Sequence, residues 1–405
     1  MTKHGVSPWL DQFPKSRLPA YPKQRGRFQT SVVVVGGGLT GCLTAYALAA
    51  AGEKVTLLEA NRIGQGDTAS SFGWISEEPG LAFHEVERAI GLRRARQAWQ
   101  AWRRAALDFS ALVRRLDIHC YLEPRDVVTV AFTPDQITGL KKDRKARVDA
   151  GVGASLLNTR AIRGMLAIEA AAGLRARDGA ALDPYRACLG IIRAAVDRGA
   201  AVHEHSVVRR ITFTRRIAEV FTAGGSIRTR RVVIATGMPG AIFKSLARHF
   251  WFHTRYFVMT APVPAQIRRQ LGARTSIVRD LARPPHVLRW VDDSRLLVAG
   301  AESALIPERQ RPKTVVQRTA QLMYELSTIY PDISGLQPAY GWTADHARSG
   351  DGLPYIGPHR NFPHHLFAFG NSGHDIAAAY LASRILLRYC IAASDSADAA
   401  FGFNR

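Results

Sequence analysis

Cysteine is scarce in this 405-residue sequence, and its four copies are far apart: Cys42, Cys120, Cys188 and Cys390. No two of them stand at a Cys-x-x-Cys spacing, which excludes the common zinc-ribbon and dithiol patterns. The histidine pairs at residues 203/205 and 364/365 have no further partners at metal-ligand spacing. We therefore expect no metal site, reduced and mostly buried thiols, and a cytoplasmic location.

Acidic residues and lysine are also scarce. The chain has 33 acidic against 55 basic residues, a net charge of +22, and only nine of the basic residues are lysine. The arginines are spread from Arg17 to Arg405, without a dense basic run that is interleaved with aromatics. We interpret them as a solvated arginine-rich surface, with non-specific affinity for polyanions and no specific nucleic-acid partner.

Long charge-free runs are limited to one stretch, residues 31–52, which follows Lys23, Arg25 and Arg27. By hydropathy alone this stretch could be a signal peptide or a membrane-inserted helix. Its five glycines, two threonines and β-branched residues argue against both, as does the Glu53-Lys54 pair that leads into another apolar run. We expect at most peripheral membrane association.

The same stretch carries the most informative motif of the chain. Residues 32–35 are four valines, and Gly36, Gly38 and Gly41 follow in the order Gly-x-Gly-x-x-Gly. A second apolar run at residues 55–58 ends at Glu59, eighteen residues after Gly41. Strand, glycine turn, helix, strand and acid in this order form the dinucleotide-binding fingerprint.

Each part of this fingerprint has a physical role. Gly36 makes the tight turn, Gly38 lets a pyrophosphate approach the backbone, and Gly41 lets the helix pack close to the sheet. The helix N-terminus offers N–H groups to the phosphates. Glu59 can accept hydrogen bonds from the adenosine ribose, and its charge repels a 2′-phosphate. The residues therefore predict FAD or NAD rather than NADP.

Hydrophobic spacing organises the rest of the chain. We expect an irregular arm over residues 1–29 and one long helix over residues 86–116. Asp183 before Pro184 is a strong helix start, because aspartate caps and proline suits the first turn. Residues 286–291 and 295–298 predict a hairpin, and residues 376–390 a final helix.

Five further blocks resemble the FAD-dependent amine and amino-acid oxidoreductases of the D-amino-acid oxidase, glycine oxidase and sarcosine oxidase superfamily. Their sequences are IGQGDTASSFGWI at residues 63–75, GAALDPY at 179–185, VIATG at 233–237, DGLPYIG at 351–357 and FGNSGHDI at 369–376. The 351–357 block, with Gly341-Trp342 before it, looks closest to D-amino-acid dehydrogenase and γ-glutamylputrescine oxidase relatives. The blocks follow one another along nearly the whole chain.

The resemblance implies an α/β fold with two domains. A discontinuous Rossmann-like FAD-binding domain would comprise residues 1–80, 180–245 and 340–405. An α+β substrate-binding domain with an antiparallel sheet would comprise residues 81–179 and 246–339.

The resemblance also implies FAD as the cofactor and assigns its contacts, with the backbone at Val208 expected at the adenine. The full predicted set is Gly36, Gly38, Leu39, Thr40, Gly41, Glu59, Ala60, Arg62, Thr68, Ala69, Ser70, Ser71, Phe72, Gly73, Trp74, Val208, Ala235, Thr236, Gly237, Asp351, Gly370, Ser372, Gly373, His374, Asp375 and Ile376.

Two departures from the family pattern bear on the flavin. Asp375 replaces the last glycine of the family's Gly-His-Gly segment, so a carboxylate stands where negative charge builds on flavin reduction. Sarcosine oxidases carry a cysteine for covalent flavin before the aspartate block, whereas residues 341–350 contain none. We therefore expect non-covalent FAD.

The chemistry implied is oxidation of a C–N bond: a neutral amine loses a hydride to flavin N5, and water hydrolyses the imine. His374, His346 and Arg348 are the candidate catalytic residues. Arg289 and Arg255 are candidates for binding a substrate carboxylate, because a guanidinium matches its geometry, and Tyr256 and Trp342 are candidate pocket walls. The electron acceptor would be oxygen or a quinone.

Three alternatives stay open at this point. A flavin-dependent hydroxylase using NAD(P)H has a Gly-Asp block that Gly350-Asp351-Gly352 weakly imitates. A flavoprotein that modifies a tRNA base would suit the basic charge, although the scattered arginines do not favour it. An inactive flavoprotein that serves as an assembly subunit is the third.

Overall fold

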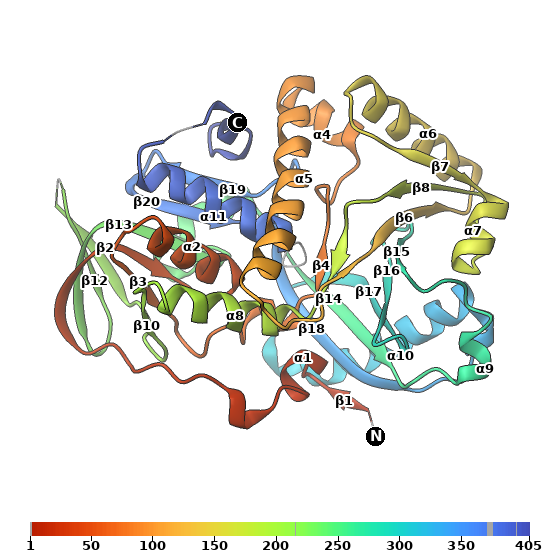
Figure 1. Ribbon diagram of the computed structural model, residues 1–405, viewed down its shortest axis with the longest axis horizontal. Helices are drawn as coiled ribbons and strands as arrows, with labels where there is room; N and C mark the ends of the chain where they lie inside the picture. The colour runs from red at the N-terminus through yellow and green to blue at the C-terminus, as the bar shows by residue number, and fades with distance from the viewer. Residues whose placement is uncertain (1, 215, 371–375, 394) are drawn as a thin grey trace.

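Two large β-sheets organise the molecule, and helices cover them (Figure 1). The computed structural model describes residues 2–214, 216–370, 376–393 and 395–405. One sheet has eight strands and the other nine; a third, three-stranded sheet joins β4 (Trp74–Ile75), β9 (Ala180–Ala181) and β5 (Glu123–Pro124). Parallel and antiparallel pairing together confirm the predicted α/β class.

The eight-stranded sheet has a parallel centre. Its path runs β10-β3-β2-β13-β12-β11, and β20, which pairs with β19, joins β13 in parallel. The valines at 32–34 are buried on both faces, as expected for a central parallel strand. The strands are β2 (Gly26–Val35), β3 (Val55–Leu58), β10 (Ala201–His203), β11 (Arg210–Phe213), β12 (Ala218–Phe221), β13 (Gly225–Gly237), β19 (Tyr355–His359) and β20 (Phe362–Phe369).

The largest hydrophobic core forms between this sheet and several helices, mainly α2 (Leu39–Ala50), α5 (Leu92–Arg115), α8 (Pro184–Val196) and α11 (Ile376–Cys390). α8 begins as predicted, because the Asp183 carboxylate accepts hydrogen bonds from the N–H groups of Tyr185 and Arg186 at 2.9 and 3.0 Å. The helix expected over residues 86–116 is two helices, α4 (Phe83–Ile90) and α5. They separate at Gly91, whose φ of +83° is not helical.

The nine-stranded sheet is mainly antiparallel and runs β1-β18-β14-β17-β16-β15-β6-β8-β7. β16 and β17 form the predicted hairpin; Asp292 and Asp293 take positive φ in its turn. The strands are β1 (Lys3–His4), β6 (Asp126–Ala131), β7 (Ser155–Asn158), β8 (Ala172–Ala176), β14 (Trp251–Thr260), β15 (Ser276–Arg279), β16 (Val287–Val291), β17 (Arg295–Ala304) and β18 (Pro338–Arg348).

The remaining helices are short or pack on this second sheet. α10 buries Leu322 and Leu326 against it. The α-helices are α1 (Pro8–Asp11), α3 (Asp67–Ser70), α6 (Pro134–Asp149), α7 (Thr159–Leu166), α9 (Ala265–Arg268) and α10 (Arg311–Ile329). Short 3₁₀ helices cover Lys15–Arg17, Ala241–His249, Glu308–Gln310, Pro331–Ile333 and Ser396–Phe401.

Two expectations differ from the structure at the chain's edges. The arm at residues 1–29 is not wholly irregular: it holds β1 and α1, and β2 already begins at Gly26, because Gly26–Gln29 pairs with β13. The proposed domain division also cuts across a sheet. β1 and most of β18 fall in the ranges predicted for FAD binding, yet both belong to the nine-stranded sheet, where β18 pairs with β14.

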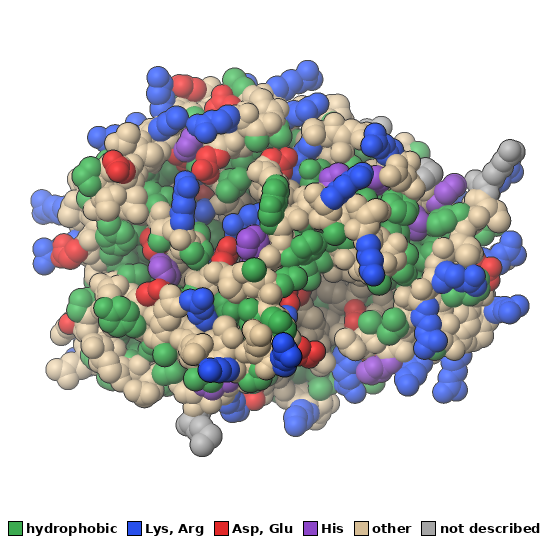
Figure 2. Space-filling model, turned by 180° about the vertical axis from the view of Figure 1, so that it is seen from behind, with side chains coloured by type: hydrophobic (Ala, Val, Ile, Leu, Met, Phe, Trp, Pro, Cys, Tyr) green, Lys and Arg blue, Asp and Glu red, His purple; other side chains and the backbone are tan. Residues whose placement is uncertain are grey.

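The basic surface is dispersed. Figure 2 shows basic side chains spread over one face, among hydrophobic and neutral ones. Not every arginine is solvated as predicted, however: Arg147, Arg255 and Arg289 are buried.

Candidate functional site

The three motif glycines in the turn between β2 and α2 have different surroundings. Gly36 has a φ of +108°, and a Cβ there would lie 2.5 Å from the Ala235 carbonyl oxygen. A Cβ on Gly41 would lie 1.8 Å from the Gly36 oxygen, so helix and strand touch at this point. At Gly38, Thr68 Oγ1 at 3.3 Å is the one atom of the described residues that would lie within 4 Å of a Cβ. Gly38 therefore faces open space at the N-terminus of α2.

Glu59, directly after β3, is held by backbone groups. Its Oε2 accepts from Gly37 N–H at 2.6 Å and its Oε1 from Asn61 N–H at 2.7 Å. These two bonds fix the carboxylate at the mouth of the glycine turn, which is the place expected of a ribose-binding acid.

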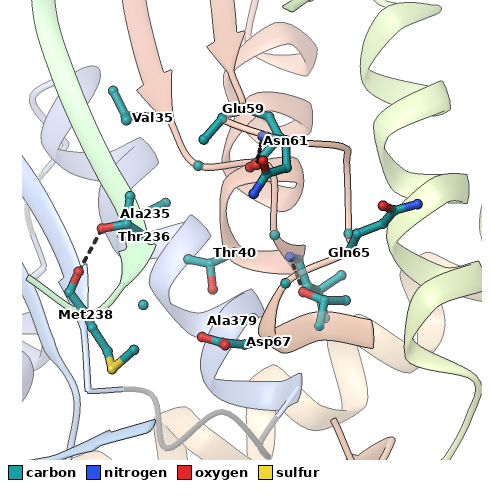
Figure 3. A pocket seen from close by; sticks show the side chains of 18 of the residues that line it. Val35, Thr40, Glu59, Asn61, Gln65, Asp67, Ala235, Thr236, Met238 and Ala379 are labelled. Carbon is teal, nitrogen blue, oxygen red and sulfur yellow. Dashed lines mark hydrogen bonds between the residues drawn. The ribbon is translucent and has the colours of Figure 1, made fainter. Parts of the chain in front are cut away.

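A cavity of about 730 Å³ opens at the carboxyl ends of β2, β3 and β13. Figure 3 shows Glu59, Thr40, Asp67 and Thr236 around it, and Met238, whose carbonyl accepts from the Thr236 hydroxyl at 2.9 Å. Fourteen residues of the predicted FAD set line it: Gly36, Gly38, Leu39, Thr40, Glu59, Ala60, Arg62, Thr68, Ser71, Val208, Ala235, Thr236, Gly237 and Ile376.

Other members of that set lie behind the lining. Ser70 and Phe72 present their carbonyls to Trp342 Nε1 at 3.0 Å and Arg289 Nε at 3.0 Å. Asp351 is held by Arg405 through two nitrogens. Also off the lining are Gly41, Ala69, Gly73, Trp74 and Gly370. Ser372, Gly373, His374 and Asp375 lie outside the described residues.

Three of the residues predicted to act on substrate converge on an acid that the sequence did not single out, Glu302 of β17. Arg348 Nη2 lies 3.1 Å from both Glu302 carboxylate oxygens. Arg255 Nη1 and His346 Nε2 each lie 3.8 Å from Glu302 Oε1. His346 also lines the cavity. We call these four residues the Glu302 cluster.

The electrostatics of the Glu302 cluster follow from burial and its two guanidinium groups. Burial alone would raise the pKa of Glu302, but the charges of Arg255 and Arg348 outweigh it and hold that pKa below its usual value. Burial, supported by the same arginines, lowers the pKa of His346 to about 4. Burial also lowers the pKa of Arg255 to about 10. At neutral pH the cluster thus contains two cations, one anion and a neutral imidazole.

Arg255 and Arg348 lie off the cavity lining, and so do the other three substrate candidates, which have structural contacts. Arg289 donates to the carbonyls of Phe72 and Leu182 at 3.0 and 3.1 Å, so it secures the loop that enters the cavity wall. The Tyr256 hydroxyl pairs with Ser303 Oγ at 3.0 Å. Trp342 stacks on Phe257 with ring centroids 5.3 Å apart. None of these contacts brings the side chain to the cavity.

Comparison with known proteins decides the family. The family model described as "FAD dependent oxidoreductase" (DAO) matches residues 31–388. The chain belongs to the DAO family of FAD-dependent oxidoreductases. This membership confirms the predicted resemblance, the oxidoreductase class and FAD as the cofactor.

Several of the relatives are named as oxidoreductases of amines or amino acids. The γ-glutamylputrescine oxidoreductase of Escherichia coli K12 is 26% identical over 359 residues, covering 88% of this chain and 82% of that protein. The glycine oxidase of Bacillus licheniformis is 25% identical over 367 residues, covering 88% and 90%. The crystal structure of glycine oxidase from Geobacillus kaustophilus has the same fold, with a TM-score of 0.77 at 19% identity over 93% of this chain and 99% of that one.

The cavity fits the cofactor of the DAO family. Its volume lies within the usual range for ligand sites, and the glycine at the start of α2 leaves its cradle free of a side chain. Of the first N–H groups of α2, that of Leu39 donates to Thr68 Oγ1 at 2.9 Å. In the part of the chain that the structure describes, no helix is long and apolar enough to cross a membrane. Nor does a cluster of three or more His, Cys, Asp or Glu in those residues have the arrangement of a metal site.

Several residues of the cavity and of the Glu302 cluster were not predicted from the sequence. Glu302 carries no local signal, since only the register of β14, β17 and β18 brings it to His346. Asp67 lies inside the block at residues 63–75 and lines the cavity. It could have been predicted as a site residue because it is an acid among small polar residues. Asn61, His205 and Met238 also line the cavity without having been predicted.

Proposed function

We propose that this protein oxidises the C–N bond of a small amine or amino acid. The neutral amine gives a hydride from carbon to flavin N5, and water hydrolyses the resulting imine. Bound FAD supplies the hydride acceptor; the chain's own residues bind the cofactor, orient the substrate and set the charge around it. Oxygen or a quinone then takes the electrons.

One observation carries this proposal: the cavity is continuous from Glu59 to His346, and His346 belongs to the Glu302 cluster. An adenosine at Glu59 and a pyrophosphate at Gly38 direct the rest of the cofactor toward Gly237, Met238 and β18. The reacting end would thus lie where the two large sheets meet.

The Glu302 cluster suits a substrate that carries a carboxylate. Two guanidinium groups against one carboxylate leave one positive charge in the cluster, whose member His346 lines the cavity. Arg348 is the accessible member, with 38% of its side chain exposed. A neutral His346 adds no charge that would repel a second cationic group. The relatives act, by their names, on glycine or γ-glutamylputrescine, and both substrates hold an amine and a carboxylate.

Non-covalent attachment of FAD is part of the proposal. Among the described residues that line the cavity there is no cysteine. Acid precipitation should therefore release all of the flavin into the supernatant, and yellow colour left in the pellet would contradict this.

The function is tested by anaerobic reduction of the FAD-loaded protein. D-amino acids, glycine, sarcosine, polyamines and γ-glutamylputrescine are mixed with it, and bleaching of the visible flavin band is followed. At least one amine should bleach the flavin rapidly. Bleaching by NADH and by no amine would overturn the proposal in favour of a hydroxylase. Readmitting oxygen or adding a soluble quinone then identifies the acceptor.

Arg348→Gln refines the test for any amine that bleaches the flavin. The substrate concentration for half-maximal reduction should rise at least tenfold for carboxylate-bearing amines, because the accessible guanidinium is lost. The exposed Arg94→Gln serves as the matched control and should behave like the wild type.

A further inference from the structure

Asp67 is the one acid on the cavity wall without a partner among the described residues. It stands in the first turn of α3, and its Oδ2 lies 3.1 Å from the position that a Cβ on Gly237 would take. No hydrogen bond or ion pair reaches its carboxyl from the described part of the chain. Glu59, the other acid on this wall, is by contrast held by two backbone N–H groups.

The elements packed around α3 bring no neutralising charge to Asp67. On β18, Asp345 adds a further negative charge, although it is bound by Thr254 and Arg311. Burial first, and then Asp345, raise the pKa of Asp67 to about 6.

The remaining charged groups near α3 are engaged elsewhere or lie elsewhere on the wall. Asp11 of α1 is bound by Lys3 and Tyr340, and Asp183 pairs with Arg186 at 3.3 Å. Arg62, His205 and His346 complete the titratable lining with Glu59.

FAD brings negative charge into this same cavity. The cofactor's pyrophosphate is a dianion, and Thr40 at the α2 N-terminus lines the wall together with Asp67 (Figure 3). A second anion beside an unpartnered carboxylate in a partly desolvated site is unfavourable unless the carboxylate accepts a proton.

We propose that Asp67 takes up a proton from solvent when FAD binds, so that the affinity for the cofactor falls as the pH rises. This inference rests on the proposed FAD site. Below a pH of about 6 the carboxyl of the FAD-free protein is already protonated, and binding has its full strength. Above it, each pH unit weakens binding by up to about tenfold, until the pH exceeds the higher pKa of Asp67 in the complex.

The test measures FAD binding to the FAD-free protein between pH 5.5 and 8.5 by quenching of flavin fluorescence. The wild-type dissociation constant should rise at least fivefold from pH 6 to pH 8. Asp67→Asn, which keeps the shape but cannot ionise, should bind with a flatter profile and more tightly than the wild type at pH 8. Every other residue of the lining is the same in both proteins, so the difference between the two profiles reports Asp67. Asp135→Asn, an exposed acid in the first turn of α6, is the matched control and should follow the wild type.

Calorimetry in two buffers of different ionisation enthalpy counts the protons directly. At pH 7.5 the wild type should take up more protons per FAD than Asp67→Asn. Identical pH profiles in both proteins, or loss of FAD binding in Asp67→Asn at every pH, would overturn the inference while the cofactor site stands. A wild type that binds no FAD at any pH would instead overturn the site itself.

Discussion

At the scale of single residues, the acid that matters most beside the cavity is one with no motif around it. Glu302 has 8% of its side chain exposed and is surrounded by Arg255, Arg348 and His346. Its negative charge offsets the repulsion between the two guanidinium groups that lie beside it. Glu302 thereby sets both the stability of this corner and its remaining positive charge.

Glu302→Gln should lower the free energy of unfolding by about 3 kcal/mol, because it leaves a buried guanidinium without its counter-ion. The loss is not larger because Arg348, the other guanidinium beside Glu302, is partly exposed to water. Urea unfolding at pH 7 measures it.

The matched control is Glu123→Gln, which breaks an ion pair with Arg125 where the glutamate side chain is 59% exposed. It should cost only about 0–1 kcal/mol. Equal losses in the two variants would show that the Glu302 cluster gains nothing from burial.

At the scale of elements, the parts that could be predicted are those encoded within one short stretch. The turn from β2 through α2 to β3 is contiguous, so its glycines and Glu59 specify it locally. The same holds for Asp183 before α8 and for the turn of the β16–β17 hairpin. The break at Gly91 was missed because the helical spacing continues across it on both sides.

The Glu302 cluster could not be predicted, because it depends on pairing between distant strands. β14, β17 and β18 are separated along the chain, and their register alone brings Glu302 and His346 together. Arg289 and Arg348 look alike in sequence. Only the fold shows that Arg289 binds two carbonyls while Arg348 stays partly exposed beside the cavity.

Replacing a glycine of the turn by alanine adds one methyl group. At Gly41 this should disturb the packing of helix on strand, and at Gly38 it should disturb cofactor binding. Gly41→Ala should destabilise the FAD-free protein by at least about 2 kcal/mol, because the Cβ would meet the Gly36 oxygen at 1.8 Å. Gly38→Ala should cost about 1 kcal/mol, since its Cβ would lie 3.3 Å from Thr68 Oγ1 and displace that hydroxyl slightly, yet it should weaken FAD binding at least tenfold by filling the cradle. Urea unfolding and FAD titration measure both variants. Wild-type FAD affinity in Gly38→Ala would place the pyrophosphate elsewhere.

At the scale of the whole molecule, both large sheets contribute residues to the lining of the cavity. β2, β3 and β13 of the eight-stranded sheet supply one end, which includes Glu59 after β3, and His346 and Ala347 of β18 supply the opposite end from the nine-stranded sheet. A ligand that fills the whole cavity therefore contacts both sheets, whereas one that fills only the end at Glu59 contacts one. Ligand binding stabilises the conformations that make the contacts.

Hydrogen exchange in the presence of FAD or of ADP can show whether a bound ligand contacts both sheets. Both ligands should protect amides around residues 36–41 and 59–62, where the glycine turn and Glu59 lie. FAD alone should also protect the Ala347 end of β18, because only the longer ligand reaches the nine-stranded sheet. Helix α6 lies outside the cavity lining and should exchange at the same rate in all samples. Equal protection of β18 by ADP and FAD would mean that the cofactor does not bridge the sheets, and the reacting end would then have to lie away from the Glu302 cluster.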